Sequence, residues 1–575
     1  MIEHFVDYKE MFVEEPNNEE DIEQIKSKIL SSYDFKLPIE YNKHLKLTNV
    51  VKSDVEMGSM IKHIYNYKKQ KNESHDLFDS KLSSIYSTSR SFLKDNQKFI
   101  KKFNYQQGTN MYSFIQEYID FKSEQNFLSK YQYVQFKRFY YLNSITVFLQ
   151  MLSLYNILSP LLSLLSPMLG LIIPYFVLYW KGIKLSLKDY WQVIKKIVYR
   201  NGIINGLLNF HKNSLNQNAY TAVTIFFFGM SIYNNINSCK KFISNTEYLI
   251  TLLDKTSQFI HNGETMIRHI HKQTSELKSF GDFNKNMMKY LENIKQMKYT
   301  LDTIHCEKDK MMKYSKIGWI MKCNFELFNN DMFHDTVMYI IYLNNFNENM
   351  SNVNMCYKDG YINKCSFIKD KKTKMEGSYY ISHMTESPIK NTIDFNKNII
   401  ITGPNASGKT TMIKSTILNL FFSQSIGFGC YDSCATPIYD YFHSYLNIPD
   451  TSNRDSLFQA EARRCKDIID FIDKKKDKRH FCIFDEIYSG TNPEDAVLCA
   501  SLYLDKMNKK KDKVDYVLTT HYIDMCKKFE NSDWVINKKM SSNKNGDIVE
   551  HTYLFENGIS TINGGYSVLL NLEKE

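Results

Sequence analysis

The chain has 575 residues, too many for one hydrophobic core, so several folding units are expected. Hydrophobic residues at 43% and charged residues at 24% exclude wholesale disorder, and only 21 Gly and 10 Pro disfavour a turn-rich all-β chain. A net charge of +10 permits a polyanionic partner without requiring one. A mean hydropathy of −0.41 excludes a polytopic membrane protein.

The amino-terminal region, residues 1–136, is polar, rich in lysine and predicted to be helical. Apolar residues between Leu77 and Phe103 recur mostly at intervals of three, four and seven, which is the spacing of one helix face. The first ten residues lack the basic and apolar segments of a cleavable signal. The 11 cysteines include no CxxC pair, so we expect reduced thiols in an intracellular chain and no structural zinc.

Residues 139–180 contain no charged side chain. As one helix they would extend about 63 Å, twice the roughly 30 Å of a bilayer core. The sequence therefore predicts an apolar hairpin over 137–182, with passes at 139–156 and 161–180, a turn near Asn156–Pro160 and both ends on the cytoplasmic side. Lysines flank the segment and aromatic residues cluster at its two ends, as expected for a membrane segment. A hairpin buried in a large soluble core is the alternative.

Residues 183–345 are predicted to form a helical core and lever region. The uncharged run 219–233 is short for a membrane span, and we assign it to a core. Leu253, Ile260 and Ile267 repeat by seven and indicate an apolar stripe on a long helix. Gly281 and its polar neighbours are expected to divide this section into two antiparallel arms. Residues 346–376 have irregular charge and are predicted to be a connector.

The pattern of apolar and polar residues changes at residue 377. Short apolar strands are predicted at Asn398–Thr402, 481–484 and 516–520, with helical stretches between them. This alternation indicates a mostly parallel sheet with helices on both faces. The predicted fold is thus an α/β P-loop ATPase domain over 377–575, preceded by a mostly α-helical region.

The first strand is followed by a phosphate-binding motif. The pattern G-x-x-x-x-G-K-[ST] is matched by Gly403, Pro404, Asn405, Ala406, Ser407, Gly408, Lys409 and Thr410. The two glycines let backbone N–H groups converge on phosphates at a helix N-terminus. Lys409 would neutralise the β- and γ-phosphates of ATP, and the Thr410 hydroxyl would complete the shell of Mg²⁺.

Two further strands end in polar residues at the same sheet edge. Asp485 would hold the metal through water, and Glu486 would orient or deprotonate the attacking water. His521 ends the third strand and could sense the γ-phosphate. An acidic strand end and a structural histidine are the alternatives.

Together these motifs resemble the ATPase domain of the MutS DNA mismatch-repair family. The phosphate loop from Ile401 to Thr411 is similar to that of the family, including Pro404-Asn405. The blocks that carry the remaining resemblance are Thr436-Pro437-Ile438 with Phe442, Phe458 with Glu461, Asp485-Glu486-Ile487 with Gly490-Thr491 and Asp495, and Thr519-Thr520-His521-Tyr522.

The resemblance implies a homodimer or heterodimer formed through the ATPase domain. Ser456 falls where family members have the serine that reaches the partner's nucleotide. Arg454 and Leu457 replace the usual glycine and threonine around it, which weakens that expectation. A convincing mismatch-reading domain is not recognisable upstream.

Two functions follow from the resemblance, and both stay open at this point. The first is an ATPase that couples turnover to DNA binding in mismatch repair or recombination, where the lysine runs 474–476 and 509–511 could meet phosphates or be solvated helix ends. The second is a membrane-anchored relative acting on a protein or membrane partner without mismatch recognition, with the ATPase domain on the cytoplasmic side. A transporter subunit is disfavoured because no L-S-G-G-Q motif precedes Asp485.

Overall fold

The computed structural model describes residues 26, 28–30, 32–68, 77–104, 111–183, 186–200, 215–305, 315–369, 372–446, 457–545 and 548–562. The chain divides into two compact units, which are treated separately here. The first comprises Met1–Ser32, Thr109–Asn262 and Glu292–Met338, and the second comprises Tyr33–Gly108, Gly263–Leu291 and Tyr339–Glu575.

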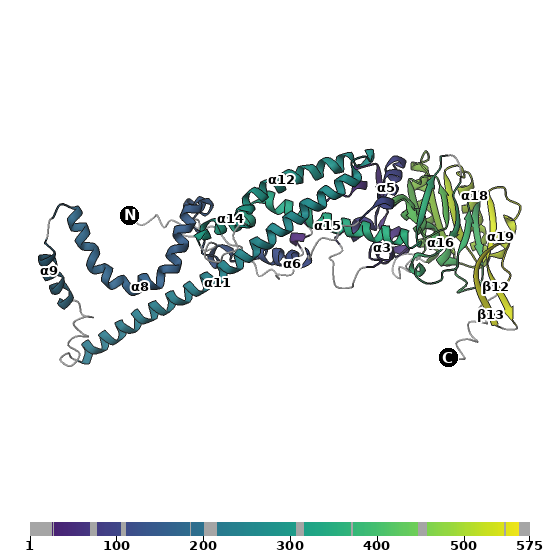
Figure 1. Ribbon diagram of the computed structural model, residues 1–575. Helices are drawn as coiled ribbons and strands as arrows, with labels where there is room; N and C mark the ends of the chain where they lie inside the picture. Colours follow the sequence, from purple (N-terminus) through teal and green to yellow (C-terminus); the bar gives the residue numbers. More distant parts are fainter. Residues whose placement is uncertain are drawn as a thin grey trace. The chain divides into compact units, whose positions relative to one another are not determined.

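The first unit is helical (Figure 1). It contains α6 (Met111–Lys122), α7 (Phe127–Lys130), η3 (Lys137–Ser144), α8 (Thr146–Trp180), α9 (Leu187–Arg200) and α14 (Ile317–Asn329), with parts of α11 (Leu215–Thr274), α12 (Gly281–His305) and α15 (Asp331–Lys358). Helices α8 and α14 pack closely because Gly318 has no side chain. A Cβ there would lie 2.5 Å from the Thr146 carbonyl oxygen.

The hairpin predicted within 137–182 is wrong, because α8 continues through Asn156–Pro160 as one helix of 35 residues. Pro160 cannot donate to the Asn156 carbonyl, but the Ser159 hydroxyl donates to that carbonyl instead at 3.0 Å. Figure 1 shows that α8 bends along its length, as proline-containing helices do. Among the described residues, Thr146–Leu165 is long and apolar enough to cross a membrane, and only 11% of its apolar window is buried.

The assignment of 219–233 to a core is also wrong. This run lies near the start of α11, where Tyr220, Phe226 and Phe227 are each 65% exposed. The prediction rested on the shortness of the run, and length alone does not show whether the side chains have neighbours.

The second unit begins with short helices and two short strands. These are η2 (Pro38–Tyr41), β1 (His44–Lys46), α2 (Asn49–Asp54), α3 (Met57–Tyr65), α4 (Asp79–Leu82), β2 (Ile85–Ser87) and α5 (Arg90–Lys102). The amino-terminal region is therefore not wholly helical, since β1 and β2 pair antiparallel. The predicted break near Gly281 is confirmed: α11 ends at Thr274, η4 (Lys278–Phe280) follows, and α12 starts at Gly281. The Asn284 amide donates to the Thr274 carbonyl at 3.1 Å across this turn.

A six-stranded sheet forms the centre of the α/β part. Its order is β13 (Ile548–Asn557), β12 (Val535–Asn545), β6 (Asn398–Thr402), β11 (Val514–Thr519), β10 (His480–Asp485) and β9 (Tyr441–Tyr445). All neighbours from β12 to β9 are parallel, and β13 is antiparallel at the edge. The three strands predicted from sequence are thus adjacent, in the order β6, β11, β10, which confirms the mostly parallel sheet.

Helices cover both faces of this sheet. On one face, α17 (Leu457–Lys474) and α18 (Pro493–Asn508) bury Cys465, Ile468 and Leu504 in a core with Phe484 and Leu518 of the strands. Helix α16 (Lys409–Ser425) packs on β10 and β11 without joining that core. A short helix, α19 (Ile523–Lys528), follows β11. The arrangement brings the carboxyl ends of β6, β10 and β11 to one edge.

The predicted connector 346–376 is wrong. Helix α15 extends to Lys358, and the next residues form strands of a second, five-stranded sheet ordered β5 (Asn391–Asp394), β4 (Lys374–Ser378), β8 (Ser433–Thr436), β3 (Asn363–Phe367) and β7 (Phe428–Gly429). Lys364 and Lys374 face solvent while Cys365 and Met375 are buried. This alternation over very short strands produced the irregular charge pattern that suggested a connector.

Candidate functional site

The phosphate loop connects the end of β6 to the start of α16 at Lys409. Ala406 and Gly408 both have positive φ, at 63° and 91°. A Cβ on Gly403 would meet the Ser407 hydroxyl at 2.7 Å, so the loop depends on this glycine at a close approach. Ser407 is fully buried, and its hydroxyl has no hydrogen-bond partner among the described residues. An unsatisfied hydroxyl in this loop suits a ligand that supplies a polar group.

Lys409 is folded back onto this loop. Its Nζ donates to the carbonyls of Gly403 at 3.0 Å and Pro404 at 3.2 Å, and it lies 3.1 Å from His521 Nε2. The side chain is only 6% exposed, and burial lowers the pKa of the ammonium, partly offset by the charges of Glu486 and Asp485. A buried cation held mainly by neutral carbonyls is suited to receive an anion.

Thr410 and Asp485, predicted as the metal site, are in contact. The Thr410 hydroxyl donates to one Asp485 oxygen at 2.8 Å, and the Thr519 hydroxyl donates to the other. The described residues contain no group of three or more His, Cys, Asp or Glu side chains that could hold a metal by themselves. One hydroxyl and one carboxylate fit Mg²⁺, which keeps several waters and takes remaining ligands from phosphates. Thr519 was quoted in a motif, but the sequence did not assign it this role.

Glu486 and His521 form a pair beside Lys409. His521 Nε2 lies 2.7 Å from Glu486 Oε1, and Lys409 Nζ lies 3.8 Å from the same oxygen. The hydrogen bond from His521 is the largest cause of the lowered pKa of Glu486, and the positive charge of Lys409 adds to it. Glu486 also has a φ of 50°, a conformation that non-glycine residues rarely adopt. The structure therefore brings both predicted catalytic residues to the phosphate loop and keeps Glu486 ionised.

A cleft of about 670 Å³ opens beside the loop. Its lining includes Asn405, Gly408, Lys409, Thr410, Thr411 and Glu486, together with Tyr380, His383, Ile389 and Tyr553. Its volume is that of a small-molecule site, and the second group of residues offers rings and an apolar chain to a flat group. Sequence reasoning missed Tyr380, His383 and Tyr553, because no motif marks them and only the folded chain brings them near the loop.

The loop after Glu486 is anchored by Glu461 of α17. This carboxylate is 2% exposed and accepts hydrogen bonds from the Ser489 backbone N–H at 3.1 Å, the Ser489 hydroxyl at 3.0 Å and the Gly490 N–H at 3.2 Å. The match of Glu461 to the family pattern thus has a structural counterpart. Ser456, predicted to reach a partner's nucleotide, lies outside the described residues.

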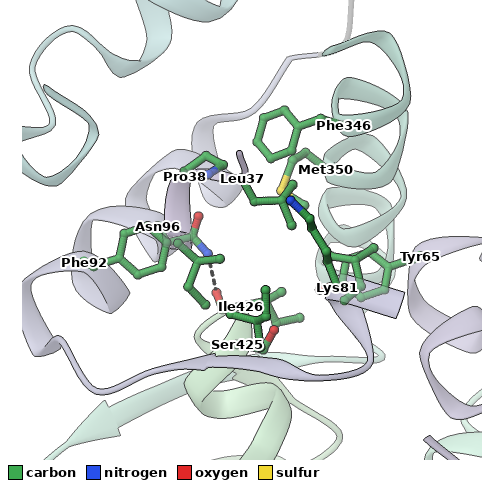
Figure 2. A pocket seen from close by; sticks show the side chains of 13 residues that line it. Leu37, Pro38, Tyr65, Lys81, Phe92, Asn96, Phe346, Met350, Ser425 and Ile426 are labelled. Atoms are coloured by element: carbon green, nitrogen blue, oxygen red, sulfur yellow. Dashed lines mark hydrogen bonds between the residues drawn. The ribbon is translucent and has the colours of Figure 1, made fainter. Parts of the chain in front are cut away.

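A second cavity, of about 40 Å³, lies at the opposite end of α16 (Figure 2). It is mostly apolar, and Asn96 of α5 donates to the Ile426 carbonyl at 3.0 Å across it. The neighbouring Gln97 donates to the Gly427 carbonyl at 2.7 Å. The space is too small for more than a water molecule or two, so it belongs to the packing of α5 on the end of α16.

Comparison with known proteins agrees with this geometry. The family model for MutS domain V matches residues 399–571. The chain is similar to Endonuclease MutS2 of Staphylococcus haemolyticus (26% identical over 186 residues, 32% of this chain and 23% of the relative) and to that of Staphylococcus carnosus (26% over 200 residues, 34% and 25%). It is also similar to Endonuclease MutS2 of Staphylococcus aureus strain Newman (27% over 175 residues, 30% and 22%).

The matched segment spans about a quarter of the length of these curated relatives. The match to the family model begins within β6 and includes the phosphate loop, Asp485, Glu486 and His521. The likeness is therefore concentrated in the α/β part of the second unit, where residues 399–571 match MutS domain V.

Proposed function

We propose that the chain is a Mg²⁺-dependent ATPase of the MutS type that couples hydrolysis of ATP to DNA binding. The observation that carries the proposal is the convergence of Lys409, Thr410, Asp485, Glu486 and His521 at one edge of the parallel sheet. Three separate sequence motifs supply these side chains. A phosphate loop, a metal-holding pair and an ionised base are the parts that phosphoryl transfer to water requires.

In this mechanism the loop N–H groups and Lys409 bind the phosphates, so that Lys409 exchanges its carbonyl partners for phosphate oxygens. Thr410 and Asp485 would hold Mg²⁺, which when bound neutralises charge on the phosphate oxygens. Glu486 orients the attacking water and accepts its proton. His521 positions Glu486 through their hydrogen bond and lies within reach of the transferred phosphate. Tyr380, His383 and Tyr553 would face the base of the nucleotide.

The relatives are named as endonucleases. We do not propose nuclease activity for this chain, because the family model matches only domain V, and we propose only the ATPase and DNA-binding roles. A dimer formed through that domain is part of the proposal and rests on the family resemblance of Ser456 and its surroundings. We also assign the chain to the interior of the cell, with domain V on the cytoplasmic side of any membrane that it contacts.

Two substitutions test the proposed chemistry. Lys409→Ala should abolish ATP binding, since it removes the cation at the loop. Glu486→Gln should retain binding, measured by calorimetry with Mg²⁺, and lower the turnover rate by about a hundredfold or more. The matched control is Glu494→Gln, an exposed acid in the first turn of α18, which should hydrolyse ATP at the wild-type rate. Normal turnover by Glu486→Gln would show that another group activates the water.

A further inference from the structure

The first unit exposes many large apolar side chains on two helices. On α8, Val147, Met151, Leu154, Tyr155, Leu161 and Leu164 are between 49% and 73% exposed. On the first part of α11, Tyr220, Val223, Phe226, Phe227, Met230 and Tyr233 are between 46% and 65% exposed. Soluble proteins rarely leave apolar surface of this extent in water, so it indicates a partner.

The two helices form an antiparallel pair. The Cys239 thiol donates to the Ile157 carbonyl at 3.4 Å, and the Asn235 amide donates to the Ser163 hydroxyl. Residue numbers therefore increase along α8 as they decrease along α11, which is the register of an antiparallel pair. In these contacts polar groups face the neighbouring helix, while the apolar side chains named above are exposed. Internal pairing of polar groups is what an apolar solvent requires of a helix pair.

Length and charge match a bilayer. Residues 215–239 contain no charged side chain, and as a helix they extend about 37 Å, the thickness of a bilayer core with part of its interfaces. At one end of this run, the exposed Lys240 and Lys241 directly follow Cys239, which contacts Ile157 of α8. At the other end, the exposed lysines are Lys181, Lys188, Lys195 and Lys196. Cations at both ends of an apolar pair are complementary to the anionic headgroups of lipids.

Helix α9 has the composition of an interfacial helix. Its Tyr190 is buried against the Tyr175 ring of α8, with ring centroids 4.8 Å apart, while Trp191 is 62% exposed beside the exposed lysines. Trp180, at the end of α8, is 92% exposed. Tryptophans next to lysines at the end of an apolar segment are typical of the headgroup level of a membrane.

We propose that α8 and the first part of α11 form a helical hairpin that inserts into a lipid bilayer, with α9 lying among anionic headgroups. The sequence alone placed both passes within 139–180 and assigned 219–233 to a core, whereas the structure supplies α11 as the second arm. A soluble protein partner would have to cover the outward sides of both helices and also match cations at both ends. The inference is independent of ATP hydrolysis.

Flotation of the full chain with vesicles tests the insertion. With vesicles of phosphatidylcholine and phosphatidylglycerol, the chain should float and stay bound in high salt and alkaline carbonate until detergent is added. Phe227→Glu should lower partition by about a hundredfold, because it places a charge near the middle of the apolar stretch. Tyr299→Glu is the matched control, since Tyr299 is 88% exposed on α12, outside the hairpin, and its variant should float like the wild type. A wild-type chain that stays in the aqueous fraction, or equal losses in the two variants, would overturn the proposal.

The four tryptophans provide a second readout of the same chain. Vesicles whose lipids carry bromine on their acyl chains should quench the fluorescence of a Trp319→Phe/Trp534→Phe variant, which keeps Trp180 and Trp191. A Trp180→Phe/Trp191→Phe variant should not be quenched. If the second variant is quenched as strongly as the first, the membrane contact lies elsewhere and the proposed hairpin is wrong. Loss of ATPase activity in any of these variants would not bear on the result.

Discussion

At the scale of single residues, the proposed metal-binding end of the candidate site depends on hydroxyl groups. Asp485 receives a hydrogen bond from Thr410 and another from Thr519, so both carboxylate oxygens are already oriented. Such orientation of a metal-binding carboxylate by neighbouring donors commonly changes metal affinity by one to two orders of magnitude when it is lost. The two threonines come from α16 and β11, which are far apart in sequence.

Removing the Thr410 hydroxyl should therefore change the metal dependence of turnover. Thr410→Val should raise the Mg²⁺ concentration for half-maximal ATP hydrolysis by about ten- to a hundredfold, since a ligand and a donor to Asp485 are both lost. Thr410→Ser keeps the hydroxyl and should stay near the wild-type value. The measurement is a titration of the hydrolysis rate with Mg²⁺ at saturating ATP. Equal behaviour of the valine and serine variants would show that Thr410 is not a ligand.

Most of this site could be predicted at the residue scale, for a physical reason. Phosphate binding constrains consecutive residues of one loop, so the elements of the loop appear as a local pattern from Gly403 to Thr411. The cleft wall of Tyr380, His383 and Tyr553 has no such pattern, because its residues meet only through β4, β5 and β13. Residues that a fold brings together from distant segments leave no local signal.

At the scale of elements, the hydrophobic strands were predictable and the amphipathic ones were not. β6, β10 and β11 are buried on both faces and appear as continuous apolar runs. β3 and the first three residues of β4 alternate between solvent-facing and buried side chains. Each strand has only five residues, so their charges resembled those of a loop. The prediction for α8 was wrong for a different reason. The thickness of a bilayer suggested a turn near Pro160, but the helix continues there, and the Ser159 hydroxyl donates to the Asn156 carbonyl that Pro160 leaves without a backbone donor.

The β9–β10 pair contains a histidine contact that predicts how acid affects stability. His443 Nε2 and His480 Nδ1 are 3.0 Å apart, and His480 Nε2 lies 3.1 Å from the Lys475 carbonyl. His480 therefore donates to Lys475 and accepts from His443, which requires an unprotonated Nδ1. Burial lowers the pKa of His443 to about 3 and also lowers that of His480.

A histidine whose pKa is lower in the folded chain than in the unfolded chain binds its proton preferentially when unfolded. The contribution of these neutral histidines to the free energy of unfolding is thus fully present above the unfolded pKa of about 6.5. It decreases as the pH falls toward the folded pKa, by up to roughly 1.4 kcal/mol per pH unit for each histidine. His443→Gln should flatten this part of the pH dependence, measured by denaturant unfolding from pH 7 downward. His383→Gln, which changes an exposed histidine, should leave the slope as in the wild type. Parallel curves for wild type and His443→Gln would contradict the argument.

At the scale of the whole molecule, the proposed partners occupy different parts of the chain. The candidate nucleotide site lies in the second unit, and the proposed apolar hairpin lies in the first. Long helices, α11, α12 and α15, continue from one unit into the other. Because α11, α12 and α15 each contribute residues to both units, coupling between ATP and a distant partner has to be tested on the full chain.

Two lysine runs that are separate in sequence are neighbours in the α/β part. The run 474–476 starts at the last residue of α17, and the run 509–511 follows α18. Lys510 forms an ion pair with Asp473, next to the first run. The strands β10 and β11 start just after them, so both runs lie at the amino edge of the sheet, opposite the phosphate loop. Lys474, Lys475 and Lys476 are all exposed. The result is a lysine-rich surface away from the nucleotide.

This surface gives the proposed DNA binding a measurable salt dependence. Duplex DNA should stimulate ATP hydrolysis by the full chain, and its affinity should fall as salt rises, because each neutralised phosphate releases about 0.9 counterions. Replacing Lys474, Lys475 and Lys476 by glutamine should reduce the slope of log affinity against log salt by up to about 3 while leaving hydrolysis without DNA unchanged. The matched control replaces Lys285, Lys289 and Lys298 of α12 by glutamine and should keep the wild-type slope. Unchanged slopes in both variants would place the DNA contacts elsewhere, and hydrolysis that is indifferent to DNA would contradict the proposed coupling itself.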